Sequence, residues 1–187
     1  LTIVVLHLWA AIQLKLENAK ARPLGYDVNH TIQASAASRY MIWTGSVIAA
    51  FLVYHILHFT VGAAGSDTFK ANLAEYTMTH DFHLFGLTIV GAGAKVHDVH
   101  TMMVLGFQKA PVAIFYMIAV SLLSFHLWHG FESAFQSLGL RTSRWGSFLR
   151  AVTRLFVVAY VLGSLAIPGS ILAGVVKVGA PAAVAAV

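Results

Sequence analysis

The run FYMIAVSLLSFHLWHGFESAFQSLGL (residues 115–140) decides the fold, because apolar side chains fill most of it and Glu132 is its only acidic residue. Pro111, a residue type favoured in the first turn of a helix, stands just before it. A helix needs about 20 predominantly apolar residues to cross a bilayer. The sequence therefore predicts a transmembrane helix over residues 111–135.

The composition of the whole chain also indicates a membrane protein. The 187 residues are 58% hydrophobic and only 10% charged, whereas about a quarter of the residues of a soluble domain are charged. We expect one membrane domain over residues 1–187. The chain has no cysteine, so it supplies no disulfide and no thiolate ligand for an iron–sulfur cluster. Its net charge of +5 is spread too thinly to indicate nucleic-acid binding.

Three further apolar runs predict spans: one that ends near Leu16, one over residues 39–62 and one over residues 152–176. The expected fold class is therefore all-α, an integral membrane helical bundle with four visible transmembrane helices. The chain opens in the middle of an apolar run that is shorter than a span. We therefore expect a fifth helix, the first of the bundle, before Leu1.

The segment between the second and third visible spans, residues 63–110, is expected to be a long loop. Within it FHLFGLTIVGAGA (residues 82–94) is apolar, but it is too short and too rich in glycine to cross a bilayer. We expect it to lie at the membrane interface or to fold back on itself. The last residues, 179–187, are small and repetitive and predict a flexible tail.

The basic residues predict the orientation of the spans, since cytoplasmic loops carry an excess of lysine and arginine. Two of the links between spans are rich in basic residues, and both lie on the same side of the predicted bundle: Lys15, Lys20, Arg22 and Arg39 in one, and Arg141, Arg144, Arg150 and Arg154 in the other. The long loop has only three lysines over a greater length. We expect the two basic links to be cytoplasmic and the long loop to face outward.

Five of the ten histidines fall inside the predicted spans: His7, His55, His58, His126 and His129. An ionisable side chain at membrane depth is costly and usually marks a functional site. The alternative is that each imidazole hydrogen-bonds a neighbouring helix and only holds the bundle together. Because three different spans carry at least one histidine, we favour the functional interpretation.

The depth of the histidines suggests pairs. A helix rises about 1.5 Å per residue. His126 lies roughly ten residues from the cytoplasmic end of its span and His7 roughly nine from the end of its own, so both lie at a similar depth in the inner half of the membrane. His55 lies roughly sixteen residues from the cytoplasmic end of its span, in the outer half. A six-coordinate haem iron requires two imidazoles at one depth on facing helices. His55 then suggests a second haem, whose other ligand precedes Leu1.

Three stretches resemble the dihaem cytochrome b membrane anchors of bacterial succinate dehydrogenases and fumarate reductases, of the type with five helices in a single polypeptide. They are LHLWAAIQLKLENAKARP (residues 6–23), RYMIWTGSVIAAFLVYHILHFTVG (residues 39–62) and the run at residues 115–140. The resemblance covers the second to the fifth helix of the family. Residues 63–110 depart from its short-loop members.

This resemblance implies which histidines hold the two b-type haems. His7 and His126 would hold the inner haem, nearer the cytoplasm, and His55 would be one ligand of the outer haem, in agreement with the depths above. His58 and His129 lie one helical turn further on. Either could be the ligand instead, or could contact a haem edge, a propionate, water or a quinone.

Polar residues near the cytoplasmic ends of the spans are further candidates for the site. Arg39, Trp43 and Arg141 could contact haem propionates or lipid headgroups, although each arginine could simply be a solvated cytoplasmic charge. Ser38, Arg39 and Tyr40 are candidates for binding the quinone. The motifs HDFH (80–83) and HDVH (97–100) have the spacing of metal ligands, but we expect the haem irons to be the only metals.

The resemblance implies a membrane-anchor subunit of succinate dehydrogenase (complex II, in the tricarboxylic acid cycle) in the bacterial cytoplasmic membrane. It would pass electrons between an iron–sulfur subunit and a membrane quinone, with menaquinone the family's usual partner.

The loop over residues 17–39 would contact the iron–sulfur subunit and, through it, the flavoprotein subunit. The complex could form a higher oligomer. The chain would be an enzyme only as part of this complex, because it has no succinate or flavin site. The alternatives are a fumarate reductase anchor and a histidine-lined metal or proton transporter.

Overall fold

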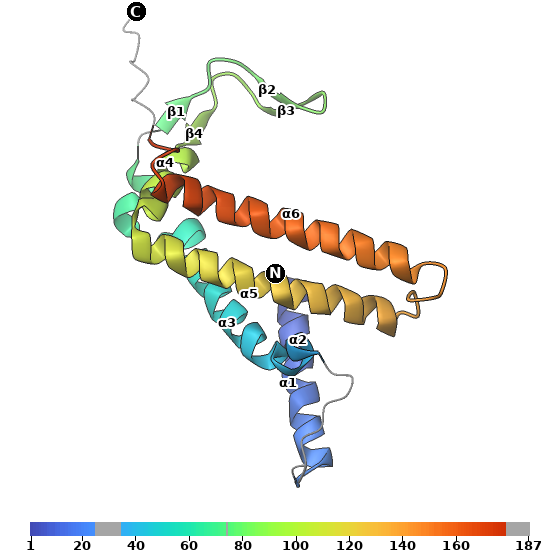
Figure 1. Cartoon of the computed structure of the whole chain (residues 1–187). Helices are drawn as coiled ribbons and strands as arrows, with labels where there is room; N and C mark the ends of the chain where they lie inside the picture. The colour runs from blue at the N-terminus through green and yellow to red at the C-terminus, as the bar shows by residue number, and fades with distance from the viewer. Residues whose placement is uncertain (25–34, 74, 179–187) are drawn as a thin grey trace, which may run out of the picture. The chain divides into compact units, whose positions relative to one another are not determined.

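The computed structural model describes residues 1–24, 35–73 and 75–178 (Figure 1). The chain divides into two compact units, Leu1–Ala34 and Ser35–Val187. Each unit is described by itself. The expected tail, residues 179–187, and residues 25–34 of the loop expected to contact an iron–sulfur subunit lie outside the described residues.

Within its described residues, 1–24, the first unit contains one helix, α1 (Thr2–Ala21). The helix ends before Arg22 and Pro23 because a proline disfavours helical geometry in the residue that precedes it. We expected the first span to end near Leu16, and the helix continues for more than a turn beyond that residue. This last part carries charged residues and is therefore not apolar enough to continue a span.

Three described helices are long and apolar enough to cross a membrane, and all three lie in the second unit: residues Met41–Val61, Ala110–Ser137 and Gly146–Leu172. This confirms a mostly helical chain with the character of a membrane protein. The fourth expected span, in α1, is not among them, so a bundle of four visible spans stays a prediction.

The first of these spans consists of two joined elements. It follows a single turn, α2 (Ala36–Arg39), and comprises α3 (Met41–His55) and a π-helical segment, η1 (Ile56–Val61). It ends at Gly62, whose φ of +81° is a conformation that glycine adopts without strain. The ends therefore agree with the range predicted from the sequence to within two residues.

The other two spans, α5 (Ala110–Ser137) and α6 (Gly146–Leu172), form an antiparallel pair that lies side by side in Figure 1. The short link between them requires this arrangement, since neighbouring helices joined by few residues run in opposite directions. Pro111 occupies the first turn of α5, as predicted. Helix α6 begins six residues before the predicted residue 152 and ends at Leu172.

Residues 63–110 contain short strands, which the prediction of an all-α fold did not include. Strand β1 (Glu75–Thr77) pairs with β4 (Lys95–His97), and β2 (Phe82–Leu84) pairs with β3 (Leu87–Val90), both antiparallel. The apolar segment 82–94 thus folds back as a hairpin. Its turn has positive φ at both Phe85 (50°) and Gly86 (81°), the geometry that two-residue hairpin turns require.

The remainder of this segment attaches to the spans. Two 3₁₀ turns, η2 (Ser66–Thr68) and η3 (Lys70–Asn72), precede the strands, and α4 (Val99–Gln108) follows them. The Lys109 ammonium lies 2.7 Å from the Asp67 carboxylate, and this hydrogen bond lowers the pKa of Asp67. The ion pair connects η2 with the start of α5.

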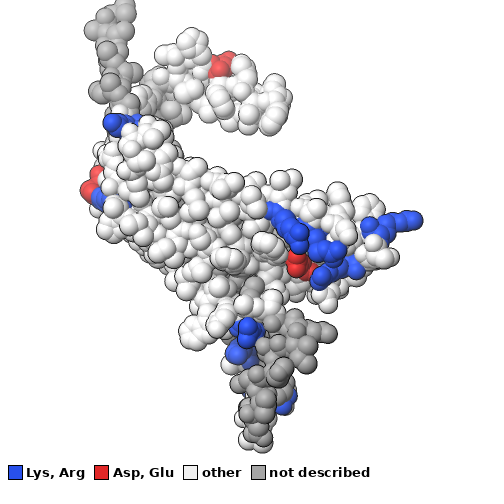
Figure 2. Space-filling model, in the orientation of Figure 1, with Lys and Arg blue, Asp and Glu red and all other residues white. Residues whose placement is uncertain are grey.

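The core of the second unit lies where α3, α4, α5 and α6 meet. Its buried apolar residues are Phe51, Val104, Phe107, Ala113, Tyr116, Ala119 and Ile171. Large apolar side chains also cover the outside of the long helices: Leu155 is 72% exposed and Phe125 is 60% exposed. Figure 2 shows much of this face without charged side chains. Such a surface is typical of helices that face lipid.

Candidate functional site

His126 on α5 contacts the first turns of α3. Its Nδ1 lies 3.3 Å from the hydroxyl oxygen of Thr44. A Cβ added to Gly45 would lie 3.4 Å from Cε1 of His126, so the glycine allows the ring to approach the α3 backbone closely. The contact joins two residues that are far apart in the sequence, and it fixes where the imidazole lies along α3.

The Thr44 hydroxyl also lies close to two backbone carbonyls. Its oxygen lies 3.2 Å from the Tyr40 carbonyl and 3.1 Å from the Met41 carbonyl, and a hydroxyl has only one proton to donate. When that proton goes to a carbonyl, the hydroxyl can accept a hydrogen bond from Nδ1–H of His126. The lone pair is then on Nε2, as in a histidine that ligates a metal through that atom.

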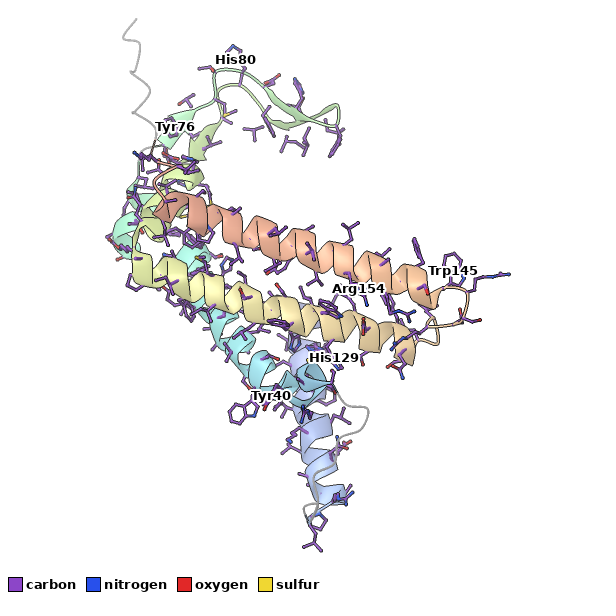
Figure 3. The ribbon with its side chains drawn as sticks, viewed as in Figure 1. Tyr40, Tyr76, His80, His129, Trp145 and Arg154 are labelled. Atoms are coloured by element: carbon purple, nitrogen blue, oxygen red, sulfur yellow. The ribbon has the colours of Figure 1, made fainter. Side chains whose placement is uncertain are left out.

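His129, one turn further along α5, lies in a different environment (Figure 3). Its side chain is half-buried, and among the described residues it makes no hydrogen bond. Its neighbour Trp128 donates a hydrogen bond to Glu132 across 3.2 Å. Of the two histidines in this stretch, only His126 therefore has a hydrogen-bond partner of the kind that orients a metal-binding imidazole.

His55, at the end of α3, lines an apolar cavity of about 480 Å³. Aromatic rings surround it: the ring centroids of Phe51, Phe59 and Tyr116 lie 5.8–5.9 Å from that of the imidazole. Its Nδ1 is buried and has no hydrogen-bond partner among the described residues. An unsatisfied buried polar atom costs about 1–3 kcal/mol.

His58 is more completely enclosed than His55, being only 3% exposed. Its Nδ1 lies 3.1 Å from the Tyr116 hydroxyl. A Cβ added to Gly65 would lie 3.2 Å from its Nε2, and one added to Gly106 would lie 3.4 Å from the same atom. Nδ1 of His58 thus has a protein partner, whereas His55 is the histidine that borders the cavity. Which of the two is the ligand stays a prediction.

The two favoured histidines lie at two levels of the second unit. His126 is opposite Gly45, and His55 lies ten residues further along α3, which corresponds to about 15 Å along the helix axis. His7 lies on α1 in the other unit, so its pairing with His126 stays a prediction. That these histidines bind haem irons also stays a prediction.

The candidate quinone residues lie four to six residues before Thr44, which contacts His126. Ser38 donates its backbone N–H to the Ser35 hydroxyl across 3.1 Å, which caps α2, and the Tyr40 carbonyl lies beside Thr44. Both Arg39 and Tyr40 are exposed (Figure 3). Their roles stay predictions, as does that of Trp43, which is 71% exposed. Arg141 lies at the far end of α5, where it donates a hydrogen bond to Gln136.

The histidine motifs of residues 63–110 support the local structure of this segment. His80 and His83 hydrogen-bond neighbouring threonines. Asp81 accepts from the backbone N–H of Ala92, and Asp98 caps α4 by accepting from the backbone N–H of Thr101. In the part of the chain that the structure describes, no three side chains of His, Cys, Asp or Glu come together as a metal site.

Two contributors to the site were not identified from the sequence. Thr44 faces His126, and Tyr116 faces His58 and the cavity beside His55. The only local signal for Thr44 is a polar residue next to Gly45 within an apolar span, which is typical of a close helix contact. Tyr116 carried no signal, because a tyrosine near the end of a span is common at membrane interfaces.

Comparison with known proteins finds no relative: no known family, no curated protein and no solved structure matches this chain. The functional argument therefore depends on the residues of the chain itself. They form a mostly helical membrane protein in which two histidines, one in contact with the Thr44 hydroxyl and one beside an apolar cavity, lie at two levels of the second unit.

Proposed function

We propose that this chain is the membrane-anchor subunit of a bacterial succinate dehydrogenase, which binds two b-type haems and passes electrons from an iron–sulfur subunit to a membrane quinone. The arrangement of His126 and His55 carries the proposal. Both are imidazoles on spans, they lie about 15 Å apart along α3, and each has surroundings that suit an iron ligand. A fumarate reductase anchor would use the same residues.

The surroundings of the two imidazoles fit the chemistry of haem. When bound, haem supplies one-electron transfer at its iron. The Thr44 hydroxyl lies where it can accept a hydrogen bond from Nδ1–H of His126, which would leave the Nε2 lone pair for the iron. The cavity beside His55 is lined mostly by aromatic and aliphatic residues, and an apolar environment is one of the factors that set a haem potential.

The remaining elements of the proposal follow the orientation predicted by the basic residues. The cytoplasmic side would carry the contact with the iron–sulfur subunit and the quinone candidates Ser38, Arg39 and Tyr40, close to the inner haem between His7 and His126. Menaquinone is the expected quinone. This chain would lie in the bacterial cytoplasmic membrane. The succinate and flavin sites would lie on its partner subunits.

A visible spectrum tests the proposal. The protein, purified in detergent with its partner subunits, should show reduced b-type haem bands after dithionite addition and two haems per chain by pyridine haemochrome assay. His97→Leu, within residues 63–110 and close to Glu75, is the control and should keep both haems. A protein that is folded and helical but binds no haem would contradict the proposal.

Replacing Thr44 by valine should change the inner haem specifically. Valine keeps the shape of threonine but cannot accept the hydrogen bond from Nδ1 of His126. Loss of such a partner typically costs about 10–100-fold in metal affinity, so we expect weaker retention of one haem and a shifted midpoint potential in a redox titration.

Two variants make this prediction specific. Thr44→Ser keeps the hydroxyl and should behave like the original protein. Ser46→Ala removes a hydroxyl on the same helix that bonds only the Ile42 carbonyl, and it should leave both potentials unchanged. Equal shifts in Thr44→Val and Ser46→Ala would mean that the hydroxyl does not act through His126.

A further inference from the structure

The turn between α5 and α6 carries positive charge. Residues 136–154 contain four arginines, Arg141, Arg144, Arg150 and Arg154, and no aspartate or glutamate. Figure 2 shows basic side chains gathered over the end of the molecule where these two helices join, with acidic atoms among them. An anion at this end would therefore be attracted from solution or from the membrane surface.

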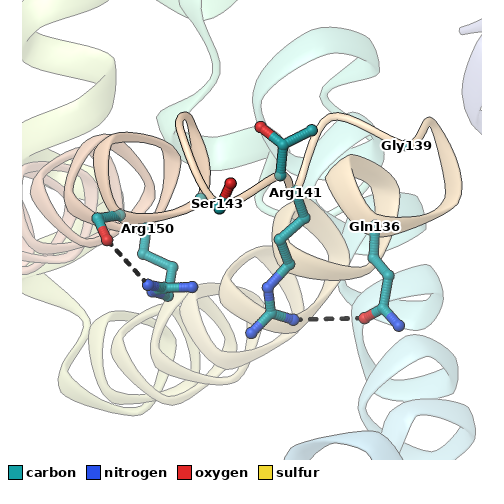
Figure 4. Close-up of a pocket in the computed structure, with 8 residues that line it drawn as sticks. Gln136, Gly139, Arg141, Ser143 and Arg150 are labelled. Carbon is teal, nitrogen blue, oxygen red and sulfur yellow. Dashed lines mark hydrogen bonds between the residues drawn. The ribbon is translucent and has the colours of Figure 1, made fainter.

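Two of the four arginines line a shared hollow of about 420 Å³ (Figure 4). Arg141 donates a hydrogen bond to Gln136 across 3.3 Å, and Arg150 donates one to Ser147 across 3.2 Å. Both arginine side chains lie beside Gly146: a Cβ added to this glycine would lie 3.5 Å from Nη1 of Arg150 and 3.7 Å from Cγ of Arg141. Arg144 and Arg154 do not line the hollow.

The remaining polar lining of the hollow suits an oxygen-rich anion. Thr142, Ser143 and Ser147 also line the hollow, and the Ser147 hydroxyl accepts a hydrogen bond from Arg150. Each guanidinium has five N–H donors, of which the described hydrogen bonds use only one. Arginine forks match the oxygens of a phosphate group in geometry and charge. A carboxylate has fewer oxygens to share between two arginines and the hydroxyls.

The position of the hollow determines where the phosphate comes from. It lies at the ends of two helices that are long and apolar enough to cross a membrane. Trp145 is 55% exposed and Phe148 is 58% exposed, and both are aromatic residues of the kind found at headgroup level. Further along α6, Leu155 is 72% exposed. A phosphate in the hollow would thus have an apolar surface next to it for acyl chains.

We propose that this hollow binds the phosphate headgroup of an anionic phospholipid through Arg141 and Arg150. Basic pockets between transmembrane helices on the cytoplasmic side are suited to such headgroups. The site depends on the membrane placement of α5 and α6 and not on haem binding. Its failure and the failure of the proposed function are therefore separate results.

Native mass spectrometry of the whole protein, titrated with dioleoylphosphatidylglycerol or dioleoylphosphatidylcholine, tests the site. The double variant R141Q/R150Q should weaken phosphatidylglycerol binding by about tenfold more than R144Q/R154Q, which removes the same number of charges from the same turn. All four substitutions fall on exposed or half-exposed side chains, so helicity by circular dichroism should not change. Phosphatidylcholine should bind more weakly, and about equally, in all proteins.

A second variant introduces a charge and leaves every arginine in place. Ser143→Asp puts a carboxylate in the hollow and should lose phosphatidylglycerol binding, whereas Ser137→Asp, outside the hollow, should keep it. Equal losses in the two arginine pairs would overturn the proposal and leave only unspecific attraction to basic side chains. Displacement of the lipid by inorganic phosphate at an equal concentration would overturn it in favour of a free-phosphate site.

Discussion

The variant His126→Leu is expected to lose the absorbance of the inner haem and to keep most of that of the outer haem. The proposed haem would lose the imidazole that contacts Thr44, and leucine offers no donor atom in its place. His55 lies about 15 Å away along α3, so the outer site should not sense the change. Electron flow from the iron–sulfur subunit to quinone should fall strongly, because the proposed inner haem would connect the donor and the acceptor.

Haem content by pyridine haemochrome assay and succinate-driven quinone reduction measure this result. The matched control is His129→Leu, one turn away on the same helix and without a hydrogen-bond partner among the described residues. It should keep two haems and most of the electron flow. If His129→Leu loses a haem and His126→Leu does not, the ligand lies one helical turn further along. If both keep two haems, the imidazoles only hold the bundle together.

The variant His55→Leu is expected to lose the outer haem. The imidazole of His55 borders the apolar cavity of about 480 Å³. Its Nδ1 has no partner among the described residues, and replacing an unsatisfied buried polar group by an apolar one is neutral or stabilising for the fold itself. The variant should therefore keep its helicity and its inner haem. Loss of the outer haem could then not be attributed to unfolding.

The control for this variant is His58→Asn, because the asparagine amide can replace Nδ1 in the hydrogen bond with Tyr116. It removes Nε2, which faces Gly65 and Gly106 rather than the cavity. Both haems should remain, as measured by low-temperature spectra that resolve the two absorbance bands. Loss of the outer haem in His58→Asn, together with its retention in His55→Leu, would reverse the assignment.

The sequence by itself determined the features that depend on distance along the chain. Three long apolar runs became the three helices that can cross a membrane, because hydropathy and length are properties of the segment alone. The different depths of His126 and His55 also follow from local geometry, since a helix converts each residue into a fixed rise of about 1.5 Å. Pro111 in a first turn and Gly62 at a helix end required no tertiary information.

The tertiary structure decided which side chains face each other. Thr44 contacts His126, 82 residues away, and both Arg141 and Arg150 lie beside Gly146. These contacts depend on the rotation of each helix about its axis, which is set by how its neighbours pack. The hairpin at Phe85 likewise needs a positive φ that an apolar sequence does not predict. His58 and His55 are one turn apart and nearly equivalent in the sequence. Only packing separates the histidine enclosed by two glycines from the one that borders a cavity.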